Sequence, residues 1–251
     1  MEQEPKFEEL LDFCWNQMFA GGNFFSMDHL FVHSLITGAK ATNHGFETMM
    51  EQKNYFCAIP MIRQQVDGAL VMWASFLAKD QNKFFLHFLK GKPINQIESD
   101  WDHLAYFGLN MDDLIKKEIV SLVDKNGKKN KNPLLLTNRF LYETLDVHFA
   151  GIKSLYKKCC KYVHPSEELF RASLFTMQQG RFKIKTWKES APLDYSEEDM
   201  RNDMQFANST LADLLATLGK LLAQTAQSGN LVMDEEDAKY ADEFIRILIN
   251  E

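Results

Sequence analysis

Apolar residues recur every three to four positions along most of the chain, with polar residues between them. This spacing is the period of an α-helix that buries one face. The stretch 175–187 instead alternates apolar and basic residues with a period of two, which is typical of a β-hairpin, and Gly180 marks its turn. We therefore predict an all-α protein, a bundle of about eight helices with one small β-hairpin near 173–187.

The predicted helices begin and end at residues that cap or stop helices. Ser26, Asn110 and Ser196 are candidate N-caps, and Gly21-Gly22 follows the first helical pattern. A further short helix is expected from Ser166. The other expected helices are 7–18, 27–53, 55–79, 82–89, 101–107, 111–123, 137–163, 196–227 and 234–249, of which 137–163 is broken at most at Gly151.

Two regions of the chain are expected to differ in role. Residues 1–190 are predicted to form one helical domain that includes the hairpin, and 191–251 a C-terminal helical extension packed on it. A chain of 251 residues is long enough to bury a sizeable core. The extension carries a leucine seam that offers a surface for dimerisation, formed by Leu211, Leu214, Leu215, Leu218, Leu221 and Leu222.

The composition is that of a globular protein, with 45% hydrophobic and 25% charged residues. The longest apolar run, 69–77, is far shorter than the roughly 20 residues that span a bilayer. The first residues are acidic and lack the basic and apolar regions of a secretory signal. We therefore expect a cytoplasmic protein without a membrane span.

Charge is unevenly distributed along the chain. The net charge is −7, which argues against a protein that coats nucleic acid, but 125–188 holds 14 Lys and Arg against 4 Asp and Glu. A basic surface can bind a phosphate backbone. The alternative is a set of solvated lysines whose neighbours in sequence are not neighbours in space.

The segment 154–166 lies within this basic region and carries the candidate chemistry. Its helical period places Lys157 two turns before His164, so the two side chains project nearly in line, whereas Lys158 is rotated about 120° from His164. Pro165 disfavours helical geometry in the residue before it, so the helix should end near His164. The imidazole would then lie near unpaired carbonyls, which favours its protonated form.

This pattern resembles the HEPN superfamily, whose helical domains carry a basic residue and a histidine four to six residues apart near the end of a helix. The string Tyr-Lys-x-Cys-x-x-x-Val-His-Pro-Ser over 156–166 is also similar to a bacterial HEPN-like group reading roughly Tyr-Arg-x-x-Ser-x-x-Val-His-Pro-Ser. Pro60-Met-Ile-Arg63 is similar to the Pro-x-x-Arg segment of that group. The family's arginine is replaced here by Lys157 or Lys158.

The resemblance implies metal-independent RNA cleavage, with His164 as general acid/base, Lys157 holding phosphate and Arg63 assisting. It also implies a toxin or antiphage setting, with RNA, a second copy of the chain, and an antitoxin or other protein as candidate partners. Further candidate substrate-binding residues are Lys153, Lys158, Lys161, Ser166, Lys183 and Lys185.

Two alternatives remain open. Lysine binds phosphate only as a point charge, so the missing arginine favours a HEPN-like module that binds a partner or ligand without catalysis. His164 could equally cap a helix end, and Arg63 could pair with Asp67 one turn later along the helix.

No cofactor and no metal are expected. His29 and His33 have the one-turn spacing of metal ligands, but no third ligand accompanies them in the sequence. The four cysteines contain no Cys-x-x-Cys pair and are expected to be reduced. Phosphate-binding glycine motifs are also absent from the sequence.

Overall fold

The computed structural model describes residues 7–19, 27–122, 134–163, 175–178, 181–184 and 195–227; side chains are described for all of these except 17–19, 27–28, 175–178, 181–184 and 219–227. Helices dominate these residues, and the all-α prediction is confirmed. The helices are α1 (Phe7–Phe19), α2 (Met27–Glu51), α3 (Tyr55–Leu77), α4 (Gln81–Leu89), the 3-10 turn η1 (Ile94–Gln96), α5 (Trp101–Tyr106), α6 (Met111–Lys116), α7 (Asn138–Leu145), α8 (Ile152–Val163) and α10 (Glu197–Gln227).

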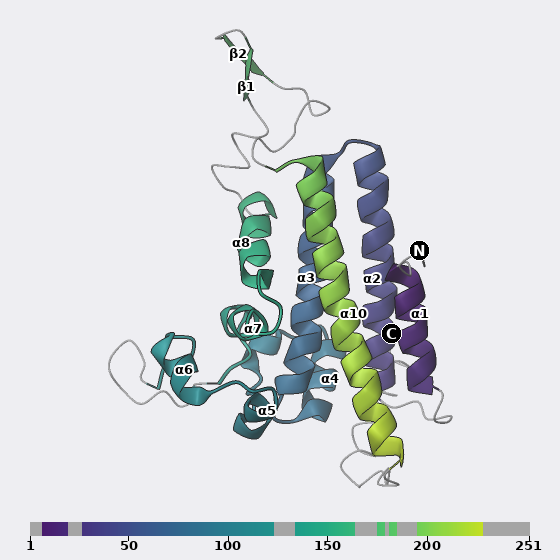
Figure 1. The fold of residues 1–251 in the computed structure, drawn as a ribbon, viewed down its shortest axis with the longest axis vertical. Coiled ribbons are helices and arrows are strands. Elements are labelled where there is room, and N and C mark those ends of the chain that lie inside the picture. Colours follow the sequence, from purple (N-terminus) through teal and green to yellow (C-terminus); the bar gives the residue numbers. More distant parts are fainter. Residues whose placement is uncertain are drawn as a thin grey trace, which may run out of the picture.

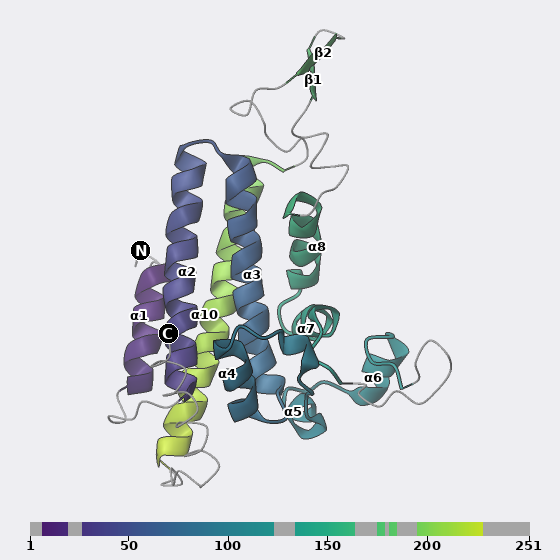
Figure 2. The same cartoon turned by 180° about the vertical axis from the view of Figure 1, so that it is seen from behind.

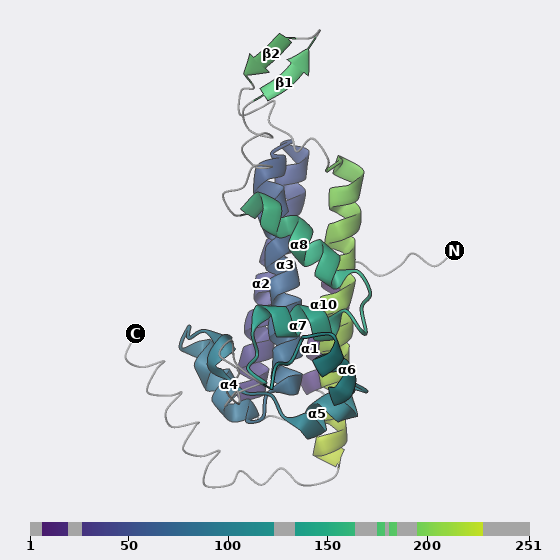
Figure 3. The ribbon, with the colours of Figure 1, turned by 90° about the vertical axis from the view of Figure 1, so that its left-hand side faces the viewer.

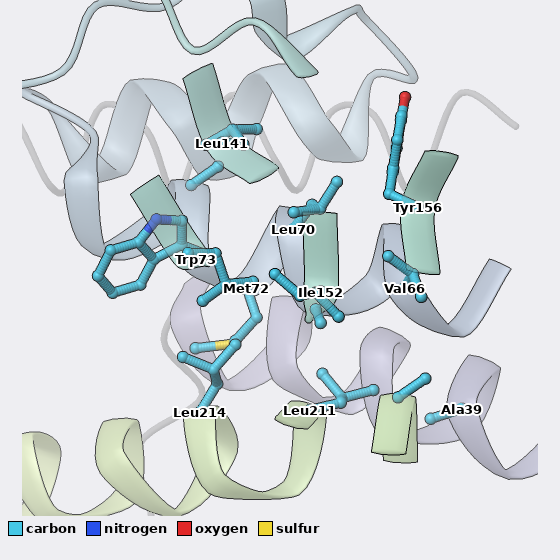
Figure 4. Packing of buried hydrophobic residues seen from close by; sticks show 14 of the residues in the cluster. Ala39, Val66, Leu70, Met72, Trp73, Leu141, Ile152, Tyr156, Leu211 and Leu214 are labelled. Carbon is cyan, nitrogen blue, oxygen red and sulfur yellow. The ribbon is translucent and has the colours of Figure 1, made fainter. Parts of the chain in front are cut away.

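Helix α3 is the centre of the bundle. The long helices α2 and α10 run along it, α7 and α8 cover another side, and α1 lies against α10 and α2 (Figures 1 and 2). Apolar side chains from all of these helices form a single buried cluster. Figure 4 shows part of it, with Leu211 and Leu214 of α10, Leu141 of α7 and Ile152 of α8 meeting around α3.

Four leucines of the predicted seam on α10 belong to this core. Leu211, Leu214, Leu215 and Leu218 are all buried, at most 6% exposed. These four leucines therefore do not offer a surface for dimerisation, which corrects the expectation from the sequence for them, since an apolar stripe does not reveal what covers it. The side chains of Leu221 and Leu222 are not among those described. The division of the chain at residues 190 and 191 stays a prediction, but α10 contributes to the same core as α3.

The helix predicted over 137–163, broken at most at Gly151, is in fact two helices, because the interruption covers all of 146–151 and not Gly151 alone. The chain leaves helical geometry after α7 and resumes it at α8, seven residues later. The Asp146 carboxylate accepts hydrogen bonds from the backbone N–H groups of Gly151 and Lys153, both at 3.0 Å. Gly151 adopts φ +111°, which glycine tolerates at low cost. The side chain of Asp146 thus caps the start of α8 and turns the chain between the two helices.

Helix α6 is shorter than predicted. It ends at Lys116, and Glu118 has a φ of 55°, which is incompatible with a continuing right-handed helix. The expected helices from Ser166 and over 234–249 lie outside the described residues.

Two four-residue strands, β1 (Phe175–Gln178) and β2 (Arg181–Ile184), pair antiparallel, with Phe175 opposite Ile184 (Figure 3). Only their backbone is described, so the basic face expected of a hairpin over 173–187 stays a prediction. Among the described helices, none combines the length and the apolar character needed to cross a membrane.

A buried hydrogen bond joins α3 to α7. The indole N–H of Trp73 donates to Thr144 Oγ1 at 2.9 Å, and the threonine hydroxyl donates to the carbonyl of Phe140 at 2.8 Å. Trp73 is 2% exposed and Thr144 is fully buried. The indole N–H therefore depends on this hydroxyl, because water does not reach it.

We expect Thr144→Val to lower the free energy of unfolding by about 1–3 kcal/mol, because it leaves the indole N–H buried without an acceptor. Urea unfolding monitored by circular dichroism measures this loss. Thr217→Val is the matched control, since Thr217 is exposed and its hydroxyl also bonds a carbonyl one turn earlier. Equal, small effects of the two substitutions would contradict the importance of the Trp73 bond.

Candidate functional site

Helix α8 presents a buried face to α3 and a basic face away from it. Ile152, Leu155, Tyr156 and Cys159 are buried, as their spacing predicts. At the end of the helix Tyr162 is buried and Val163 is 36% exposed, although the helical spacing from Ile152, Tyr156 and Cys159 predicts that Val163 continues the buried stripe. The ring of Tyr162 lies 5.9 Å from that of Tyr195, just before α10, which draws Tyr162 inward.

Arg63 of α3 is built into the contact with α8. Its guanidinium lies over the ring of Tyr156 at 3.7 Å, and its Nη1 donates to Cys160 Sγ at 2.8 Å. Its Nε donates to Asp67 Oδ1 at 3.0 Å, and Nη2 lies at the same distance from that oxygen. The expected pair with Asp67 therefore forms, and Arg63 is only 8% exposed.

The electrostatics of this cluster keep Arg63 charged. Burial acts to lower the pKa of the guanidinium, but the adjacent Asp67 carboxylate more than offsets it, and the pKa is raised overall. Burial also raises the pKa of the Tyr156 hydroxyl, in spite of the nearby guanidinium. Arg63 is thus a fixed cation beside a neutral phenol.

A second aromatic ring extends the cluster to α7. The rings of Tyr142 and Tyr156 lie 4.8 Å apart, and Asn138 Nδ2 donates to the Tyr156 hydroxyl at 3.2 Å. Lys157 Nζ lies 5.8 Å from the centre of the Tyr142 ring. Lys157 is exposed, so this cation–π contact leaves its ammonium accessible to solvent.

The four lysines of α8 divide into two groups. Lys153 is paired with Glu143, and Lys158 donates to Asp203 at 2.8 Å while its ammonium lies 3.7 Å above the Tyr195 ring. Lys158 therefore joins α8 to α10 and faces away from Lys157. Lys157 and Lys161 are exposed instead.

The structure thus brings together some of the predicted site residues. Lys153, Lys157 and Lys161 follow one another at four-residue intervals along one side of α8, and Arg63 contacts the second half of that helix. Lys158 is separate from them. His164, Ser166 and Lys185 lie outside the described residues, and of Lys183, in β2, only the backbone is described.

Several contacts of this cluster carry no signal in the sequence. Tyr156 lies under Arg63, Tyr142 lies beside Tyr156 and Lys157, and Asn138 bonds the Tyr156 hydroxyl. Helical periodicity alone marks Tyr156 only as a core residue. Its role as a platform for the guanidinium depends on a contact between α3 and α8, across more than 90 residues of chain.

The two histidines considered as metal ligands are not part of a metal cluster. His33 is exposed, and its ring lies 4.9 Å from that of Trp15 in α1. Across the part of the chain that the structure describes, no group of three or more His, Cys, Asp or Glu side chains could hold a metal ion.

Comparisons of the chain with protein-family models, with curated proteins and with solved structures returned no match. The resemblance to the HEPN superfamily therefore stays a prediction that rests on the motif residues themselves.

The two adjacent cysteines of α8 should react very differently. Burial raises the pKa of the Cys159 thiol to about 12, whereas Cys160 is partly exposed beside Arg63. Cys57 is exposed, and burial raises the pKa of the Cys14 thiol. Since the thiolate is the reactive form, Cys57 should react first with a disulfide reagent, and Cys14 and Cys159 only after unfolding.

Peptide mapping after timed labelling at mild alkaline pH measures this order, and Cys57→Ser should remove the fast phase. Fast labelling of Cys159 in the folded protein would show that α8 does not pack on α3 as described.

Proposed function

We propose that this protein binds RNA along the basic side of α8. The observation that supports the proposal best is the row formed by Lys153, Lys157 and Lys161 on a helix that has no acidic residue, with Arg63 docked against its second half. Successive lysines four residues apart are about 6 Å apart along the helix axis, so one extended strand could contact all three.

The exposure of the lysines in this row supports binding toward the C-terminal end of α8. Lys157 and Lys161 are exposed, whereas Lys153 is only partly exposed. Phosphate contacts gain free energy largely by releasing the ions condensed on the nucleic acid. Lys157 and Lys161 are therefore the residues on which RNA affinity is expected to depend most.

We extend the proposal to metal-independent cleavage by a HEPN-like site at the end of α8. Arg63 contacts Cys160, which precedes His164 by four residues in the sequence. His164 would exchange a proton with the ribose hydroxyl or the leaving oxygen, while Arg63 and Lys157 offset the charge that develops on the phosphate. A toxin or antiphage role, with a second copy or an antitoxin as partner, belongs to the same proposal.

A specific observation favours a second candidate, a HEPN-like module that binds without cutting. Arg63 is 8% exposed, and Asp67, Cys160 and Tyr156 already occupy one edge, one nitrogen and one face of its guanidinium. A phosphate oxygen in the transition state would have to accept hydrogen bonds from the remaining N–H groups of Arg63. In this candidate Arg63 stabilises the packing of α3 against α8, and the lysines alone contact the partner.

The double variant Lys157→Gln and Lys161→Gln should weaken binding of a single-stranded oligoribonucleotide by at least about tenfold. It should also reduce the slope of log affinity against log salt by about 1.4, because each lost phosphate contact removes about 0.7 on a single strand. Fluorescence anisotropy over a range of salt concentrations measures both values.

The matched control is Lys79→Gln with Lys83→Gln, which removes two exposed lysines at the same spacing near α4. This control should leave affinity and salt slope nearly unchanged. An equal loss in both double variants would mean that the whole surface attracts RNA and that α8 is no specific site.

Cleavage is tested separately by incubating the protein with total RNA in the presence of a chelator. We expect His164→Ala to abolish chelator-resistant cutting without changing the far-UV circular dichroism, since the imidazole supplies the proton transfer. His44→Ala is the control, because His44 is exposed on α2. RNA that is bound by the wild-type protein but never cut would instead favour the non-catalytic module.

A further inference from the structure

A cavity of about 480 Å³ lies between α1, α2 and α10. Figures 1 and 2 show α1 and α8 on opposite sides of α3, so this cavity is separate from the basic side of α8. Its volume falls within the usual range of small-molecule sites. Phe7, Leu10, Phe46 and Met204 supply apolar walls.

Buried amides connect this cavity to the centre of the bundle. Gln65 Nε2 of α3 donates to Asn208 Oδ1 at 2.7 Å, and Asn208 Nδ2 donates to Asn43 Oδ1 at 2.8 Å. Gln65 is 2% exposed and Asn208 is 8% exposed. The relay ends at Asn43, which lines the cavity and whose Nδ2 donates to no other side chain among the described residues.

A polar relay of this kind is costly if packing is its only role, because apolar side chains of similar volume would stabilise the core at least as well. The relay fixes the orientation of the Asn43 amide and leaves a donor at the cavity wall. Gln205 adds a second amide to the same wall, with both a donor and an acceptor.

The charges around the cavity select against anions. Arg201, at the cavity wall, is bound by two carboxylates, Glu47 at 2.8 Å and Glu197 at 3.3 Å. Glu47 also lines the cavity, and Tyr55 donates to Glu197 at 3.0 Å. These two carboxylates and one guanidinium leave a net negative charge, which can accept hydrogen bonds from hydroxyl groups but repels a phosphate.

We propose that this cavity is a binding site for a purine nucleoside of the adenosine class. Asparagine and glutamine amides pair with the adjacent donor and acceptor on the edge of adenine, and the apolar walls suit its ring. The Glu47 carboxylate, which lines the cavity, receives the ribose hydroxyls. Its negative charge, together with that of Glu197 on the other side of Arg201, makes the site selective for the nucleoside over its phosphates.

Isothermal titration of the full chain with adenosine and with adenosine 5′-monophosphate tests this site. We expect adenosine to bind and the monophosphate to bind at least about tenfold more weakly, a difference of about 1.4 kcal/mol. Asn43→Leu and Gln205→Ala should each weaken adenosine binding by at least about fivefold, the effect of one lost hydrogen bond.

His44→Leu is the control, since His44 neighbours Asn43 on α2 but does not line the cavity. Gln205 is exposed, so its variant keeps the test valid if Asn43→Leu fails to fold. Absence of adenosine binding at millimolar concentration overturns the proposal, as does equal affinity for the monophosphate or unchanged binding in both variants. None of these outcomes depends on whether α8 binds RNA.

Discussion

The burial of α3 on nearly every side is the constraint on which the rest of the structure depends. A buried polar group must find a partner inside the protein, because water cannot supply one. Three polar side chains on α3 therefore tie it to three different neighbours: Arg63 to α8, Gln65 to α10 and Trp73 to α7. Apolar packing brings the helices together, and these polar contacts fix their register.

This constraint also shapes the candidate site. Arg63 can stay charged at 8% exposure because Asp67 pairs with it and Tyr156 covers one face of its guanidinium. Those contacts orient Arg63 toward α8 and at the same time use part of its capacity to bind an external phosphate. Lys157 and Lys161 of α8 are exposed, because the face that carries them lies away from α3. The site thus combines a fixed, largely occupied arginine with exposed surface cations, an arrangement that suits binding at least as well as catalysis.

Periodicity alone predicts much of this architecture. It gives the all-α class, the centres of the long helices, most of the buried face of α8 and the pair between Arg63 and Asp67, because all of these depend on residues close in sequence. It cannot predict the turn between α7 and α8, where Asp146 caps the following helix through its side chain. Nor can it show that Lys158 pairs with Asp203, 45 residues away, or that four leucines of α10 are buried in the same core as α3.

The central claim is that a single strand of RNA lies along α8 and ends near Arg63. Titration of an isotopically labelled protein with a short oligoribonucleotide, followed by nuclear magnetic resonance, tests it most directly. The account predicts that the largest shifts occur at the amides of residues 153–163 and at the Nε–H of Arg63, with smaller changes in α1 and α2. Shifts confined to other helices, with α8 and Arg63 unchanged, would contradict it.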